Sequence, residues 1–187
     1  MGWRRLPYYE GRGYLSSTVK ELYEKMHSEG CYDGHSMFRD DTRALLGLVA
    51  GTRSRTLLDF GGGKGYQYSK DHLNRNFGIE DTKVTIYDIG VPEFSTLPLG
   101  RFDGVVSTDV LEHIPEEELP GVLDTIFSKA TKFVYIAVFC GPALQVLSDG
   151  SNAHCTIKEP GWWNKLIKAH NVKKIPLVIS YRIPKGL

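Results

Sequence analysis

Residues 57–66 read Leu57-Leu58-Asp59-Phe60-Gly61-Gly62-Gly63-Lys64-Gly65-Tyr66, and this stretch decides the fold. Its apolar start predicts a buried parallel strand, and a segment compatible with a helix follows the glycines. Glycines suit the turn between the two, because such a turn needs positive φ angles and because a ligand can lie directly on a main chain without Cβ atoms. Asp59 lies at the end of the strand, where its carboxylate can bind donors of a ligand or hold the loop. The stretch therefore predicts a binding site of the kind that nucleotides occupy.

Size and composition indicate one globular domain. The chain has 187 residues, of which 41% are apolar and 24% charged, and its formal net charge of +1 gives no reason to expect nucleic acid as a partner. Cys31, Cys140 and Cys155 are scattered and odd in number, which favours reduced thiols. No stretch approaches the ~20 apolar residues of a membrane span, and no signal-peptide core follows Met1. We therefore expect a soluble cytoplasmic protein, with an N-terminal arm and helical cap over residues 1–52 and a core over residues 53–187.

Two helices precede the glycine turn, and strands alternate with helices after it. Helices are predicted from Ser16 or Ser17 to about Gly30, from about Ser36 to Ala50, over 66–77, from Pro115 onward with Glu116, Glu117 and Glu118 in its first turn, and over 160–170. Further strands are predicted over 83–87, 104–107, 133–139 and 175–182. The second helix is expected to bury Phe38, Leu45, Leu46 and Val49.

Alternation of this kind predicts a three-layer α/β/α sandwich around a mostly parallel sheet. Ligands of such sheets bind beyond the carboxyl ends of the strands. The glycine turn, Asp88, residues 108–113 and residues 140–152 all follow strands, so they should meet at one edge of the sheet although they are far apart in the chain.

The glycine spacing separates several nucleotide-binding classes. The dinucleotide fingerprint G-x-G-x-x-G does not fit, because the third glycine, Gly65, comes only two residues after Gly63, and a phosphate-binding loop would need Ser or Thr after Lys64. With Asp59, the string D-F-G-G-G-K-G resembles the first motif of class I S-adenosylmethionine-dependent methyltransferases. Asp88 ends the second strand where that family has an acidic residue, and F-D-G-V-V followed by D-V-L-E-H-I-P over 109–115 resembles its small-molecule branch, read as FDxV…LEHIP.

The resemblance implies a Rossmann-like fold, S-adenosyl-L-methionine as cofactor and S-adenosyl-L-homocysteine as product. It implies that Asp88 binds the ribose hydroxyls, although Asp88 could instead be a turn-forming residue before Gly90 and Pro92. The cofactor-binding residues implied are Asp59, Gly61, Gly62, Gly63, Gly65, Asp88, Ile89, Asp109 and Val110, with the backbone of the glycines around the methionine part and Ile89 against adenine.

Two departures from the family pattern predict a trimmed sheet of five or six strands. Only about a dozen residues separate Asp88 from Phe102, too few for the helix and third strand that the family normally has there. One convincing strand follows Trp163, where the family commonly has two in antiparallel array.

Two histidines are candidates for a general base that takes a proton from the acceptor. By resemblance, His113 lies in the loop that flanks the methyl group, and His154 belongs to the long loop before Trp162 and Trp163. His113 could instead hold the backbone at a helix start, and His154 could be a surface residue. The spacing of Asp109, Glu112 and His113 could also present three ligands to a divalent ion, but such spacing arises by chance and we assign no metal.

The acceptor is expected to be a small molecule. DNA-methylating enzymes carry an N/D/S-P-P-Y/F motif or a Pro-Cys nucleophile in this region, and the chain has neither, although RNA is not excluded. The acceptor site could be covered by Tyr8, Tyr9, Tyr14, His35, Phe38, Trp162 and Trp163, which are equally good core residues. Two alternatives stay open, a non-catalytic cofactor-binding sensor or partner subunit and another nucleotide-cofactor enzyme such as an NAD(P) oxidoreductase. The sequence does not predict the oligomeric state.

Overall fold

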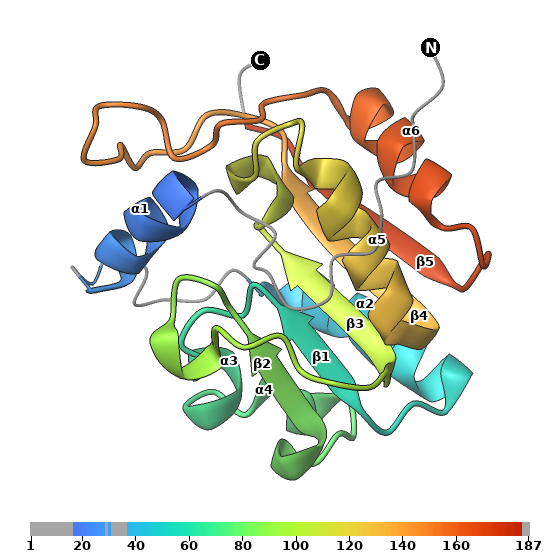
Figure 1. The fold of residues 1–187 in the computed structure, drawn as a ribbon. Helices are drawn as coiled ribbons and strands as arrows, with labels where there is room; N and C mark the ends of the chain where they lie inside the picture. The colour runs from blue at the N-terminus through green and yellow to red at the C-terminus, as the bar shows by residue number, and fades with distance from the viewer. Residues whose placement is uncertain (1–16, 29, 31–36, 185–187) are drawn as a thin grey trace.

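A five-stranded parallel sheet forms the centre of the protein (Figure 1). The structure, a computed structural model, describes residues 17–28, 30 and 37–184. The strands are β1 (Leu57–Phe60), β2 (Val84–Tyr87), β3 (Phe102–Thr108), β4 (Ala130–Phe139) and β5 (Leu177–Arg182), and their order across the sheet is β2-β1-β3-β4-β5. Every neighbouring pair is parallel. The predicted α/β fold with a parallel sheet is therefore confirmed.

The sheet is trimmed at the two places that the sequence indicated. Between Asp88 and Phe102 the chain forms one short 3₁₀ helix, Pro92–Phe94, and no strand. In the described part of the chain β5 is the one strand that follows Trp163, and it joins the sheet parallel to β4. Both β2 and β5 are consequently edge strands.

Helices cover both faces of the sheet. On one face α2 (Arg39–Thr52), α3 (Tyr66–Ser69) and α4 (Leu73–Asn76) enclose an apolar cluster with one side of the strands. On the other face α5 (Leu119–Lys129) and α6 (Pro160–His170) enclose a second, larger cluster. The remaining helix, α1 (Ser17–Ser28), lies beside the loop that follows β4 (Figure 1). The architecture is the predicted three-layer sandwich.

Strand β4 shows why apolar runs located the sheet. Phe133, Tyr135 and Ala137 pack against the α2 side, while Val134 and Ile136 pack against the α5 side. A strand that is buried on both faces has no polar alternation, so it is recognised in the sequence as a continuous apolar run.

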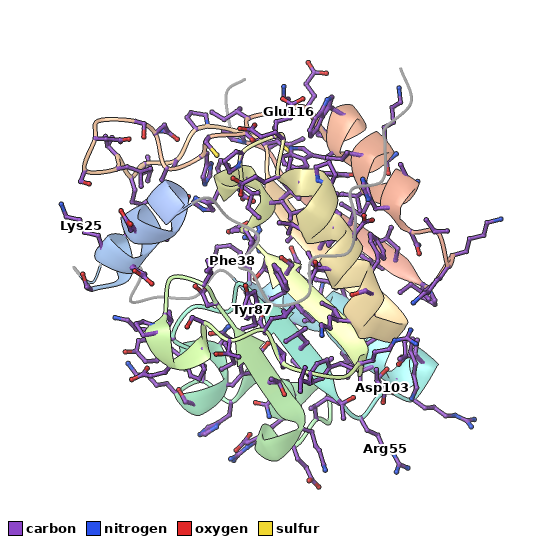
Figure 2. All side chains as sticks on the ribbon, viewed as in Figure 1. Lys25, Phe38, Arg55, Tyr87, Asp103 and Glu116 are labelled. Carbon is purple, nitrogen blue, oxygen red and sulfur yellow. The ribbon has the colours of Figure 1, made fainter. Side chains whose placement is uncertain are left out.

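The strand registers bring the functional segments to one edge. Phe60 pairs with Tyr87, Thr108 with Ala137 and Phe139 with Arg182, so neighbouring strands end at similar levels. We call this end of the sheet the carboxyl edge; Figure 2 shows Tyr87 there and Asp103 at the opposite end.

Some elements differ from the sequence prediction. The helix expected over 66–77 is two short helices, α3 and α4, separated at His72, which has a φ of 51°. Helix α5 begins at Leu119, because a turn over 116–118 comes first. Phe38 and Leu46 are 57% and 48% exposed instead of buried: Phe38 precedes α2 as its N-cap residue, and Leu46 faces away from the sheet. No helix of the described ranges has the length and apolar character that crossing a membrane requires.

Candidate functional site

The glycine turn after β1 has the conformation that its composition predicts. Gly61, Gly63 and Gly65 have φ angles of 82°, 55° and 69°. The amide of Gly61 donates to the carbonyl oxygen of Tyr87 over 2.7 Å, which joins the turn to the end of β2. A Cβ on Gly61 would lie 2.3 Å from Cγ2 of Val110, so the loop after β3 packs directly on the turn. Glycine is needed here for both conformation and space.

Asp59 is hydrogen-bonded to two side chains that follow the glycine turn. Its side chain is 1% exposed, and Oδ2 accepts hydrogen bonds from Nε2 of Gln67 and the hydroxyl of Tyr68, both over 2.8 Å. Gln67 also donates to the carbonyl oxygen of Gly62 over 3.1 Å. Burial and the Asp59 carboxylate raise the pKa of Tyr68 well above its usual value, so the phenol stays a donor. These contacts are those of a carboxylate that holds the loop.

Asp88 connects the ends of β1 and β2. Its Oδ2 accepts from the amide of Gly63 over 2.8 Å, and its Oδ1 accepts from the amide of Gly90 over 2.9 Å. The bond to Gly90 is the turn-forming role considered above, and the bond to Gly63 brings the carboxylate to the glycine turn. The next residue, Ile89, is partly buried against the α5-side cluster.

Asp109 belongs to a partly buried ion network that sequence analysis missed. It has a φ of 52° and forms an ion pair through Oδ2 with Nη1 of Arg182. Nη2 of Arg182 reaches Oδ2 of Asp41 over 2.6 Å, and the Tyr135 hydroxyl donates to Oδ1 of Asp41 over 2.5 Å. Burial raises the pKa of Asp109 to about 6, although the charge of Arg182 opposes the rise. The guanidinium also lies 4.4 Å above the ring of Phe38.

Glu112 is a completely buried carboxyl group. Its Oε1 accepts from the amide of Phe139, the last residue of β4, over 2.7 Å. Burial, with the nearby charge of Asp109, raises the pKa of Glu112 to about 8. The group is therefore mostly protonated at neutral pH.

The structure brings the two candidate histidines into contact. The rings of His113 and His154 are 4.6 Å apart, edge to face. Nδ1 of His113 lies 2.9 Å from the carbonyl oxygen of Ala153, and Nδ1 of His154 lies 2.6 Å from that of Gly141. From α1, the Tyr23 hydroxyl donates to the Ala153 oxygen over 3.1 Å. Burial lowers the pKa of both rings, that of His113 to about 3.

The hypothetical metal set is wrong in this structure. Asp109 pairs with Arg182, Glu112 accepts from Phe139, and His113 bonds to Ala153, so the three side chains have separate partners. Within residues 17–28, 30 and 37–184, no three acidic, histidine or cysteine side chains form a group that could hold a metal ion.

The proposed aromatic cover is only partly described. Trp163 is completely buried in the α5-side core, whereas Trp162 is partly buried and packs edge to face on it. Phe38 lies against Arg182 at the carboxyl edge. Tyr8, Tyr9, Tyr14 and His35 fall outside the described residues.

Comparison with known proteins gives one structural likeness. No protein-family description and no curated protein sequence matches the chain. The fold resembles the crystal structure of Burkholderia thailandensis 1,6-didemethyltoxoflavin-N1-methyltransferase with bound 1,6-didemethyltoxoflavin and S-adenosylhomocysteine. The TM-score is 0.53 at 14% sequence identity, over 82% of this chain and 76% of that one. The likeness shows that the two chains share a fold.

Proposed function

We propose that the protein is a class I S-adenosylmethionine-dependent methyltransferase that acts on a small molecule. One observation carries the proposal: the glycine turn, Asp88 and the Asp109–Val110 segment meet at the carboxyl edge. Two contacts join them, the bond from Gly63 to Asp88 and the packing of Val110 on Gly61. The likeness in fold to a methyltransferase crystallised with S-adenosylhomocysteine supports the same reading.

The residues at the glycine turn fit this cofactor. The backbone of Gly61, Gly62, Gly63 and Gly65 would hold the methionine part, with Asp59 supporting the turn, Asp109 and Val110 bounding it, and Ile89 against adenine. Asp88 would accept hydrogen bonds from the two ribose hydroxyls, since a carboxylate is an acceptor with two oxygens and about four lone-pair sites.

The cofactor supplies a methyl group that its sulfonium already activates for in-line displacement. The protein then has to position the acceptor and accept its proton. Positioning can contribute several kcal/mol, and a general base about 10²–10⁴-fold. In the proposal His113 and His154 lie beside the acceptor and are the candidates for the general base.

We also propose that the protein works in a reducing compartment such as the cytoplasm. Cys140 and Cys155 are free thiols, Cys140 buried and Cys155 exposed. Burial raises the pKa of both, so neither is poised as a reactive thiolate.

Calorimetry tests the cofactor. We expect S-adenosylhomocysteine to bind and NADH not to bind; tight binding of NADH alone would instead identify an oxidoreductase. Incubation with labelled S-adenosylmethionine and a metabolite extract then separates an enzyme from a sensor. The trimmed sheet makes the sensor worth testing, and it predicts binding of the cofactor without transfer of label.

A further inference from the structure

The chain changes direction at Asp109, between the sheet and the glycine turn. Thr108 still pairs with Ala137 in the sheet, and the amide of Asp109 donates to the Ala137 carbonyl oxygen over 3.0 Å. Asp109 then has a φ of 52°, in the left-handed region. Val110 follows, and all three of its side-chain carbons lie within 3.2 Å of the place that a Cβ on Gly61 would take. Because the strand is fixed by its pairing, the backbone angles of residue 109 decide whether Val110 reaches the turn.

The side chain of Asp109 is attached to the last residue of β5. Oδ2 of Asp109 forms an ion pair with Nη1 of Arg182, and the Arg182 and Asp109 side chains are 14% and 20% exposed. Arg182 is itself fixed, since its carbonyl oxygen accepts from the Cys140 amide over 2.8 Å and its Nη2 lies 2.6 Å from Oδ2 of Asp41. The guanidinium also lies 4.4 Å above the ring of Phe38. Arg182 therefore gives Asp109 a fixed point of attachment outside its own loop.

This attachment opposes the relaxation of a backbone conformation that is unfavourable for a residue with a Cβ atom. Such a residue stays in the left-handed region only where the surrounding contacts outweigh the cost. The amide bond to Ala137 fixes the end of the strand but allows rotation about the N–Cα bond of Asp109. The ion pair fixes the side chain, which turns with that bond. Without the ion pair, residue 109 relaxes to the right-handed or extended region, and Val110 moves away from Gly61.

We propose that Arg182 is a positioning residue for the cofactor: its ion pair with Asp109 holds the loop after β3 in the conformation that packs Val110 on the glycine turn. This inference rests on the proposed function, in which the glycine turn and the Asp109–Val110 segment hold S-adenosylmethionine. It gives the edge strand β5 a part in cofactor binding, which Arg182 performs through Asp109. Loss of the ion pair should therefore weaken cofactor binding in a protein that is still folded.

Titration calorimetry with S-adenosylhomocysteine tests Arg182 in the full chain. Arg182→Met keeps an unbranched apolar side chain but cannot form the ion pair. We expect the dissociation constant, measured on the folded fraction that the binding stoichiometry gives, to rise at least about tenfold. The control is Arg75→Met, which removes the exposed pair with Asp81 and should leave the dissociation constant within about twofold of the wild-type value. An Arg182→Met protein that folds and binds as tightly as the wild type overturns the inference.

Two variants at residue 109 separate backbone conformation from direct contact by the carboxylate. Asp109→Gly and Asp109→Ala both lose the ion pair and leave Arg182 on Asp41, but only glycine takes a positive φ without steric cost. We expect Asp109→Gly to bind S-adenosylhomocysteine at least about threefold more tightly than Asp109→Ala. Equal affinities overturn the inference, because the conformation of residue 109 would then have no effect on binding. This comparison decides the question even where Arg182→Met does not fold.

The double variant tests whether Arg182 acts through Asp109. In the Asp109→Gly background Arg182 has no carboxylate at residue 109 to hold, so Arg182→Met should change the dissociation constant by no more than about twofold. The same loss of about tenfold in both backgrounds would mean that Arg182 acts by another route, and it overturns the inference. A wild-type protein that does not bind S-adenosylhomocysteine would instead overturn the proposed function itself.

Discussion

Val110 lies directly on the glycine turn, with Cγ2 only 2.3 Å from the position that a Cβ on Gly61 would take. The contact joins the loop after β3 to the turn after β1. It also explains why the turn needs glycine at its first position, where φ is 82°. The two loops are therefore one packed unit, and a change in either should disturb both.

Gly61→Ala should destabilise the protein by at least about 2 kcal/mol, because the methyl group meets Val110 and the backbone is left-handed. Urea denaturation measures the loss. Gly161→Ala in α6 is the control, since a Cβ there meets nothing within 4 Å, and it should stay within about 0.5 kcal/mol of the wild type. Equal stabilities of the two variants would show that the turn adapts without cost.

Arg182→Met should lower the free energy of unfolding by about 3–5 kcal/mol, because it leaves the buried carboxylate of Asp41 and the partly buried carboxylate of Asp109 without their cation. The Arg182 and Asp41 side chains are 14% and 3% exposed. Arg75→Met removes the surface pair with Asp81, whose side chains are 60% and 47% exposed, and should change stability little, because water screens an exposed ion pair. Chemical denaturation of both variants at the same pH provides the comparison, and similar losses would argue against the network.

Glu112→Gln should change how stability depends on pH. The folded-state pKa of Glu112, about 8, is raised above its ordinary value of 4.5, so the folded state holds a proton that the unfolded state releases. This contribution is present below pH 4.5 and is lost as pH rises through 8, by up to about 1.4 kcal/mol per pH unit. Glutamine does not titrate and can still accept from Phe139. Denaturation at pH 5.5 and 8.5 should show that the free energy of unfolding of the variant, relative to the wild type, is higher at pH 8.5. A difference that does not change with pH would contradict the buried neutral acid.

Asp88→Ala should weaken binding of S-adenosylmethionine at least about tenfold if Asp88 accepts from the two ribose hydroxyls as proposed. The substitution also removes the bonds from Gly63 and Gly90, so folding is measured beside affinity. Asp88→Asn keeps one oxygen for the turn and is the intermediate case. An unchanged dissociation constant in a folded Asp88→Ala protein would assign Asp88 to the turn alone.

Apolar runs located the sheet because its central strands are buried on both faces. The run at 133–139 lies within β4, and the helix expected over 160–170 is α6 with the same ends. The break at His72 was not visible, because it depends on contacts outside the helix: Nδ2 of Asn74 donates to Ile79 and to Asp81 beyond it. Apolar periodicity along residues 66–77 therefore cannot reveal the break, because the contacts that accompany it are made with residues after the helix.

The sequence predicted which residues of the candidate site lie at the carboxyl edge of the sheet. It did not predict which of their side chains contact one another. Topology places His113 and His154 at the same end of the sheet, yet only the folded loop reveals that their rings touch. Asp41 lies in the first turn of α2, where it accepts from the Phe38 amide, and it also binds Arg182, which is far from it in the chain. Such long-range ion pairs leave no local pattern in a sequence.

Arg182 is the last residue of the carboxyl edge to be synthesised. During synthesis the glycine turn, Asp88, Asp109 and both histidines leave the ribosome before Arg182, which ends β5. Asp109 acquires its cation only when this edge strand docks on β4. Local opening of β5 breaks the same ion pair, so amide hydrogen exchange in β5 and the exposure of Asp109 should rise together. A ligand that binds only when Asp109 is in place should therefore slow amide exchange in β5, although it does not contact that strand.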